Sequence, residues 1–262
     1  MIPCPVRVLF IGDVFGTPGY TVARSYLNRV RDDFDFIIVN GENVAGGFGI
    51  TRKHFDGLLD AGADVVTLGN HTFDAQGTPE LLESTPRLVR PLNYPPGAPG
   101  LGYTTLESRT GERVTVVQLM GRIFLPALDD PFRAADALLE TLPANSTVIV
   151  DFHAEATSEK KAMGEFLAGR VAAVIGTHTH VQTADELIKR GTAYLTDVGM
   201  TGVQDSAIGM GFSEVLYRFT TGLPRRYRPA DAPGTVCAAA LTLSGGRATA
   251  IERIQWREPE DD

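Results

Sequence analysis

The chain has 262 residues, of which 43% are hydrophobic and 21% are charged, and its formal net charge is −8. This composition is typical of a globular protein with a large core, and the acidic balance argues against a binder of long nucleic acid or of membranes, because such proteins need a basic face. The sequence has no signal peptide and no membrane-length apolar stretch, so we expect a cytoplasmic protein.

The first third of the chain alternates short apolar runs with helical patterns. This order predicts parallel strands joined by right-handed crossover helices. Thr51 is a plausible N-cap of one of these helices. The predicted strands are residues 6–11, 36–39 and 65–68, and the predicted helices are residues 17–33, 51–61 and 78–83.

The rest of the chain reads as a mixture of strands and helices, beginning with a Pro- and Gly-rich loop at residues 90–102. We expect an antiparallel strand pair after this loop and a β-rich C-terminal part. The predicted strands are 103–107, 114–119, 147–152, 171–175, 193–196, 214–219, 236–243 and 248–256, and the predicted helices are 133–142 and 158–168. This pattern predicts an α/β protein with two packed mixed sheets and helices outside them. We expect one domain over residues 1–262, with a frayed acidic tail at 257–262.

Small residues and metal-ligand residues follow five of the predicted strands at the point where each strand ends. If these strands are parallel, their carboxyl ends converge at one edge, where α/β folds place their sites. Four of the five histidines of the chain lie at these junctions, and His54 is the exception. The junction residues are Gly12-Asp13, Asn40-Gly41-Glu42-Asn43, Gly69-Asn70-His71, His153 and Gly176-Thr177-His178-Thr179-His180.

The residue types at these junctions suit metal ions. Carboxylate, imidazole and amide groups form a ligand set suited to iron, manganese or zinc, and no cysteine accompanies them. The two cysteines, Cys4 and Cys237, form neither a disulfide framework nor a zinc-finger spacing. Glu42 could bridge two cations, which would clamp a phosphoryl oxygen and activate a shared water. The junctions therefore predict a two-metal centre.

Each junction residue also has a purely structural interpretation. Asp13 could cap the helix that follows it, Glu42 could belong to an ordinary loop, and Asn70 could form an Asx turn. The repetition after five similar strands favours the metal site over these separate explanations. His54, after Thr51, is interpreted as a surface or helix residue.

Together, these motifs resemble those of the calcineurin-like metallophosphoesterase superfamily. Gly69-Asn70-His71 and Gly176-Thr177-His178-Thr179-His180 carry most of this resemblance. Two departures from the superfamily pattern resemble its YmdB-like branch, whose members are similar to 2′,3′-cyclic-nucleotide 2′-phosphodiesterases. The first motif is Asp13-Val14-Phe15, without the usual histidine, and the second carries Glu42 followed by Asn43. The likeness extends over nearly the whole chain and implies a four-layer αββα sandwich.

The resemblance implies roles for particular residues. One ion would be held by Asp13, Glu42, Asn43 and His180, and the other by Glu42, Asn70, His153 and His178. Asn43 would then occupy the space of the missing histidine. The cofactors implied are two divalent or trivalent transition-metal ions, with iron favoured over manganese and zinc. His71 would stand beside the ions as the general acid.

The function expected from these motifs is metal-dependent hydrolysis of cyclic nucleotides, with 2′,3′-cyclic nucleotides preferred through the resemblance. His71 would protonate the departing ribose oxygen after attack by a metal-activated water. The glycine-rich loop 46–49 and residues 199–211 are candidate substrate walls. The alternatives are another phosphoesterase (a phosphomonoesterase, a protein phosphatase or a nuclease), a metal-bound regulatory protein, and a structural domain without metal. The partner expected is a small phosphate ester, with no membrane and no long nucleic acid, and a homo-oligomer stays open.

Overall fold

The computed structural model describes residues 5–258 of the chain. Cys4 and the predicted tail from residue 259 onward lie outside the described residues. Arg257 belongs to the last strand, so the expectation that the tail begins at this residue is wrong. Among the described residues, no helix is long and apolar enough to cross a membrane.

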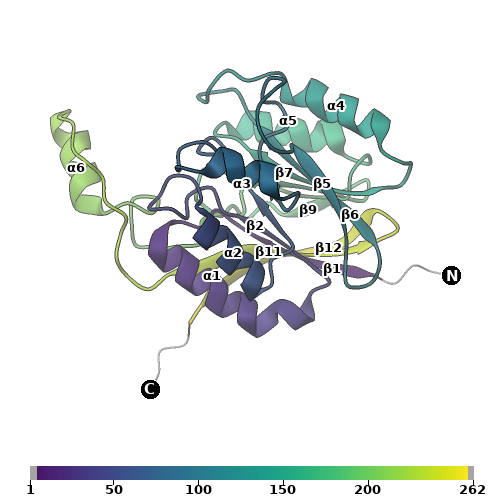
Figure 1. Ribbon diagram of the computed structural model, residues 1–262, viewed down its shortest axis with the longest axis horizontal. Helices are drawn as coiled ribbons and strands as arrows, with labels where there is room; N and C mark the ends of the chain where they lie inside the picture. Colours follow the sequence, from purple (N-terminus) through teal and green to yellow (C-terminus); the bar gives the residue numbers. More distant parts are fainter. Residues whose placement is uncertain (1–4, 259–262) are drawn as a thin grey trace.

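Two six-stranded mixed sheets pack against each other in the centre of the molecule (Figure 1). The first sheet has the order β12-β11-β1-β2-β3-β4, and its strands β1 to β4 are parallel. Next to β1, β11 pairs antiparallel with β1, and β12 pairs antiparallel with β11. Its strands are β1 (Val6–Ile11), β2 (Phe36–Asn40), β3 (Val65–Thr67), β4 (Leu88–Val89), β11 (Thr235–Ser244) and β12 (Arg247–Arg257).

The second sheet has the order β5-β6-β7-β8-β10-β9. Its four central strands are parallel, and β5 and β9 pair antiparallel at the two edges. Its strands are β5 (Tyr103–Glu107), β6 (Arg113–Met120), β7 (Thr147–His153), β8 (Ala173–Thr177), β9 (Leu187–Lys189) and β10 (Thr192–Leu195).

Helices cover the outer face of each sheet, which completes the expected αββα sandwich (Figure 1). The first sheet packs against α1 (Gly16–Val30), α2 (Arg52–Ala61) and α3 (Thr78–Ser84), with the short 3-10 helix η1 (Arg31–Asp33) after α1. The second sheet packs against α4 (Pro131–Thr141) and α5 (Thr157–Leu167).

The alternation of side chains along β1 explains why this strand is apolar throughout. Leu9 and Ile11 point into the core beneath the helices, whereas Val8 and Phe10 point into the core between the two sheets. Successive side chains of a strand point to opposite faces, so a strand covered on both faces needs apolar residues at nearly every position. The central layers therefore fix β1 firmly, and with it the position of Asp13.

The expectation of a strand at residues 214–219 is wrong, because this segment belongs to the helix α6 (Phe212–Thr221). The segment is rich in residues that favour strands, but it lies outside both sheets and has no neighbouring strand to pair with. A helix satisfies its own backbone hydrogen bonds, and Gly222, with φ of 72°, ends it. The short strands β4 and β9 were not expected from the sequence.

Phe10→Ala should lower the free energy of unfolding by about 3–5 kcal/mol, because it leaves a cavity between the sheets. Phe10 is fully buried there. Denaturant titration of the two proteins measures the difference. Phe124→Ala is the matched control, since Phe124 is 88% exposed and its replacement should change stability by less than about 0.5 kcal/mol. Equal effects of the two substitutions would contradict this account of the core.

Candidate metal centre

The candidate residues lie at the carboxyl ends of strands from both sheets. Asp13 follows β1, Glu42 and Asn43 follow β2, and Asn70 and His71 follow β3 in the first sheet. From the second sheet, His153 ends β7, and His178 and His180 follow β8. The five strands thus converge as expected, but they do so from two sheets that face each other.

His153 lies at the centre of this convergence. Its Nδ1 is 2.9 Å from the hydroxyl of Thr177, which donates its own proton to Asp151. Thr177 therefore accepts the proton of Nδ1. The other nitrogen, Nε2, is 2.9 Å from Glu42 Oε1, 2.9 Å from Asn70 Oδ1 and 3.0 Å from His178 Nδ1. A single proton on Nε2 can serve only one of these acceptors, whereas a cation can bind all of them.

The outer nitrogens of the other two histidines have partners of their own. His178 Nε2 is 3.1 Å from Glu155 Oε2, and His180 Nδ1 donates to the carbonyl of Ile208 at 2.9 Å. These contacts leave His178 Nδ1 and His180 Nε2 to face inward as lone pairs. A histidine that binds a metal through one nitrogen usually donates from the other in this way.

A second contact between acceptors joins His180 and Asn43. His180 Nε2 is 3.2 Å from Asn43 Oδ1, and the Asn43 amide is oriented by its donation to the carbonyl of Gly47 at 3.0 Å. Burial lowers the pKa of His180, so its ring is neutral near pH 7. Two lone pairs therefore face each other, which is favourable only with a cation nearby.

Asp13 adds a buried carboxylate with an unpaired oxygen. Its Oδ2 accepts from the backbone N–H of His178 at 3.1 Å, whereas Oδ1 is buried without a hydrogen-bond partner among residues 5–258. Burial raises the pKa of the Asp13 carboxyl well above its usual value. An unpaired buried carboxylate is costly unless a cation compensates it.

The shifted pKa values of the neighbouring groups reflect the same crowding. Burial opposes ionisation of Glu42, but the adjacent histidines, chiefly His153, lower its pKa to about 2. Burial also disfavours a charged His153, yet the carboxylates of Glu42 and Asp13 raise its pKa to about 9. Burial and the charge of His153 lower the pKa of His178 to about 3. The group thus attracts positive charge, and its imidazoles, amides and carboxylates fit transition-metal ions.

The two ligand sets implied by the motifs are assembled to different degrees. The atoms of Glu42, Asn70, His153 and His178 converge, and ligand atoms of Glu42, His153 and His178 all lie within 4.8 Å of one another. In the other set, His180 contacts Asn43, while Asp13 contacts His178 and lies 3.8 Å from His153. The ring of Phe15, where the superfamily pattern has histidine, packs edge-on against His180 with centroids 5.5 Å apart.

His71 stands beside this group of donors rather than within it. Its Nδ1 is 2.7 Å from Asp74 Oδ2, and its ring meets Phe48 edge-on with centroids 5.0 Å apart. The Nε2 atom makes no hydrogen bond among the described residues. Asp74 was missed at the sequence level, although its spacing of three residues from His71 is a detectable signal. His54 lies on α2, where its Nδ1 contacts Thr51 Oγ1 at 2.9 Å, and it does not line the cavity at this group.

A buried ion pair holds the loop that carries His178 and His180. Lys160 Nζ contacts Asp197 Oδ2 at 2.5 Å and donates to the carbonyl of Thr177 at 2.6 Å. The same carboxylate oxygen accepts from the N–H and the hydroxyl of Thr179. The sequence suggested no role for Lys160 or Asp197, which are 37 residues apart.

This loop stores backbone strain. In this loop, His178 and His180 have φ of 98° and 66°. In the separate segment before α6, the β-branched Ile208, whose carbonyl orients His180, has φ of 49°. Each such conformation costs about 1–3 kcal/mol and persists only where the surroundings enforce it. The buried ion pair supplies that enforcement for the histidine loop.

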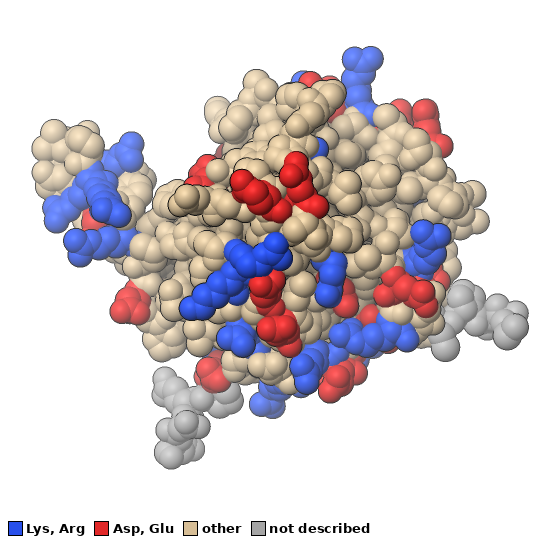
Figure 2. Space-filling view, in the orientation of Figure 1, with Lys and Arg blue, Asp and Glu red and all other residues tan. Residues whose placement is uncertain are grey.

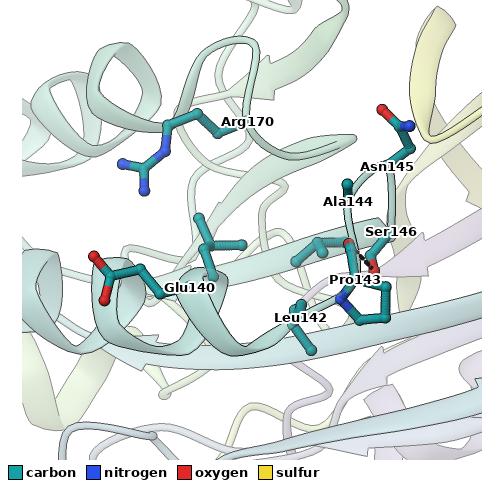
Figure 3. Close-up of a pocket in the computed structure, with 9 residues that line it drawn as sticks. Glu140, Leu142, Pro143, Ala144, Asn145, Ser146 and Arg170 are labelled. Carbon is teal, nitrogen blue, oxygen red and sulfur yellow. Dashed lines mark hydrogen bonds between the residues drawn. The ribbon is translucent and has the colours of Figure 1, made fainter.

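A cavity of about 500 Å³ opens from the candidate centre. It is lined by the candidate residues Glu42, Asn43, His71, His178 and His180, by Glu155 and Thr179, and otherwise mostly by apolar and aromatic side chains. Both predicted substrate walls contribute residues to the lining of this cavity. Gly47 and Phe48 come from the glycine-rich loop 46–49, and Ala207, Ile208 and Met210 come from residues 199–211. The smaller cavity in Figure 3, of about 230 Å³, lies between the end of α4 and Arg170 and contains none of the candidate residues.

Comparison with known proteins gives relatives that match nearly the whole chain. The sequence model of a family described as YmdB-like protein matches residues 9–254, which include every candidate residue. A 2′,3′-cyclic-nucleotide 2′-phosphodiesterase of Bacillus subtilis is 45% identical over 255 residues, covering 95% of this chain and 96% of the relative.

Two crystal structures share the fold closely. A hypothetical protein from Thermus thermophilus superimposes with a TM-score of 0.92 at 49% identity, over 97% of this chain and 100% of the other. A protein described as a novel phosphatase from Mycoplasma pneumoniae superimposes with a TM-score of 0.92 at 30% identity, over 98% of this chain and 95% of the other.

Gly69→Ala should abolish metal binding by the group around His153. A Cβ at this position would lie 2.2 Å from Glu42 Oε2 and 2.4 Å from the His153 ring, so one of them must move. Elemental analysis of the purified variant measures the loss. Gly77→Ala is the control for backbone strain alone, since Gly77 has φ of 81° and a Cβ there meets nothing within 4 Å, and this variant should keep the wild-type metal content. Wild-type metal content in Gly69→Ala would show that these side chains do not form the site.

Lys160→Met should destabilise the protein by about 3–5 kcal/mol, because it leaves the buried Asp197 charge unpaired, and should weaken metal binding about 10–100-fold by releasing the histidine loop. Denaturant titration and metal titration measure the two effects. Lys161→Met removes a neighbouring exposed lysine paired with Asp185, and should cost less than about 1 kcal/mol. Unchanged metal affinity in Lys160→Met would rule out the positioning role.

Proposed function

Because the chain belongs to the YmdB-like family, we propose that it is a metal-dependent phosphodiesterase that hydrolyses cyclic nucleotides, 2′,3′-cyclic nucleotides above others. The B. subtilis relative carries that activity in its name. The proposal includes two transition-metal ions, with iron expected ahead of manganese and zinc. Their proposed ligands are Asp13, Glu42, Asn43, Asn70, His153, His178 and His180, with Glu42 shared between the ions.

The observation that carries the proposal is the set of acceptors around His153 Nε2. A carboxylate oxygen, an amide oxygen and an imidazole nitrogen lie 2.9–3.0 Å from it, in a buried position. No arrangement of protons satisfies all these atoms, whereas a cation does. When bound, two ions would supply positive charge to phosphoryl oxygens and would make a water more acidic.

The adjoining cavity supports a small phosphate ester as the substrate. Its volume of about 500 Å³ falls within the usual range of small-molecule sites, about 300–1,000 Å³. Candidate ligands and apolar or aromatic side chains line the same cavity, so a phosphate bound at the ligands would bring the organic part of the ester near the apolar walls.

His71 is the proposed proton donor of the reaction. The oxygen of water bonds to phosphorus, the bond from phosphorus to a ribose oxygen breaks, and His71 gives that oxygen a proton. The proton that the water loses restores His71, so the net reaction adds one water and the product is a nucleoside monophosphate. Asp74 holds Nδ1 of His71 at 2.7 Å and thereby orients the ring, which leaves Nε2 to act towards the cavity. The backbone N–H of His71 donates to Glu42 Oε2 at 3.3 Å, whereas its ring makes no hydrogen bond to a candidate ligand among residues 5–258.

His71→Ala should lower the turnover of 2′,3′-cyclic AMP by about 10²–10⁴-fold, since it removes the proton donor, while the metal content stays at about two equivalents, the number expected for a dinuclear site. Parallel elemental analysis and hydrolysis assays measure the two quantities. Asp74→Asn should lower turnover less, because it disturbs only the orientation of His71.

The combined outcome distinguishes the proposal from its competitors. Metal without hydrolysis of cyclic nucleotides in the wild type would favour another phosphate ester or a regulatory role. Loss of metal in His71→Ala would contradict the assignment of His71 as a proton donor. Absence of metal even after reconstitution would refute the two-metal centre itself.

A further inference from the structure

Residues 212–229, which we call the arm, project from the two-sheet body (Figure 1, left). The arm begins with α6, in which Val215 alone is buried. Leu216, Phe219 and Leu223 are each more than half exposed. A hydrogen bond from Gly211 N to the carbonyl of Arg228, 2.9 Å long, joins the two ends of the arm. Most of its surface is therefore available to a ligand.

One side of the arm forms a wall of the cavity at the candidate metal centre. Phe219 and Tyr227 of the arm line this cavity together with Phe48 from the glycine-rich loop. Phe48 is 47% exposed and Phe219 is 78% exposed, so aromatic surface stands open at the cavity wall. Aromatic faces of this kind stack on nucleobases, whichever base is present.

A second cavity, also of about 500 Å³, adjoins the first. Phe48 and Tyr227 line both cavities, so they lie between them. The second cavity is otherwise lined by Arg226 and Arg228, with Gly46 and Pro229. Within residues 5–258, neither arginine has a carboxylate partner within 4.0 Å. Neither charge is therefore held in an ion pair, although Glu214 lies near enough to Arg228 for this arginine to help lower the pKa of its carboxyl.

The charge of the arm differs in sign from that of the whole chain. The arm carries four arginines and one glutamate in a protein with a net charge of −8, and Figure 2 shows the basic side chains gathered on it. Aromatic surface beside unpaired arginines is the combination that binds single-stranded nucleic acid, through stacked bases and neutralised phosphates. A mononucleotide bound in the first cavity would not contact Arg226 and Arg228, which line the second cavity.

We propose that the arm recognises short oligoribonucleotides that end in a 2′,3′-cyclic phosphate, an inference that rests on the function proposed above. The cyclic phosphate lies at the metal centre, and the terminal base stacks against Phe48 and Phe219, the exposed aromatic rings of that cavity. The phosphate that links the preceding nucleotide lies between Arg226 and Arg228, and the second cavity is large enough for that nucleotide. The preferred substrates are thus the cyclic-phosphate products of RNA cleavage rather than free cyclic mononucleotides.

The test compares hydrolysis of 2′,3′-cyclic AMP with that of adenylyl-adenosine 2′,3′-cyclic phosphate by the metal-loaded full chain. The wild type should favour the dinucleotide in kcat/KM by about tenfold, the effect of one charge-assisted phosphate contact. Arg226→Gln/Arg228→Gln should reduce this ratio to about one. Added salt should also reduce the wild-type ratio, because it competes with the phosphate contact.

Arg29→Gln is the matched control, since Arg29 is an exposed arginine in the last turn of α1. It should keep the wild-type ratio. A wild-type ratio near one, a ratio that survives in the double variant, or the same loss in Arg29→Gln would each overturn the proposal.

A binding measurement separates this inference from the proposed function. Calorimetry compares 3′-AMP with adenylyl-adenosine 3′-phosphate, neither of which carries the cyclic ester. Tighter binding of the dinucleotide that is lost in Arg226→Gln/Arg228→Gln supports recognition by the arm, even if the wild type hydrolyses neither cyclic compound and the proposed function fails. Equal binding of the two compounds by the wild type overturns the inference, whether or not hydrolysis occurs.

Discussion

The structure depends on the crowding of hydrogen-bond acceptors at the ends of β2, β3, β7 and β8. Around His153 Nε2, a carboxylate, an amide and a second imidazole approach to 2.9–3.0 Å without enough protons to join them. Such a group is unfavourable in a buried position unless positive charge is present. The surrounding fold provides the rigidity for it, since β1, β2 and β7 are held between apolar layers on both faces.

Residues around the candidate ligands hold this arrangement in place. Thr177, Glu155 and the carbonyl of Ile208 each take one nitrogen of a histidine, and so direct the other nitrogen inward. The buried pair of Lys160 and Asp197 fixes the strained loop between β8 and β9. Strain and buried charge are both costly, and both lie beside the candidate centre rather than elsewhere in the sandwich.

The arm brings a different chemistry to the same cavity. The sandwich supplies acceptors that attract cations, whereas the arm supplies aromatic rings and arginines that suit bases and phosphates. In the proposed function, an acidic protein recognises an anionic substrate through a locally basic element, while the candidate metal centre would hold the reacting phosphate. The base of the arm lies next to Ile208, whose carbonyl orients His180, so the arm and the candidate centre are adjacent in the chain as well as in space.

The sequence by itself determined the alternation of strands and helices and the identity of the candidate residues, because the apolar period and the polar residues at strand ends are local features. The strand predicted at residues 214–219 was wrong, because these residues favour strands but have no sheet to join and form α6 instead. Only the tertiary structure decided that the strands converge from two sheets, and that Asn70 meets His153, 83 residues away. The partners of the site, among them Asp74, Glu155, Lys160 and Asp197, likewise depend on packing. The distances between remote segments depend on how the two sheets pack, and local sequence patterns do not determine that packing.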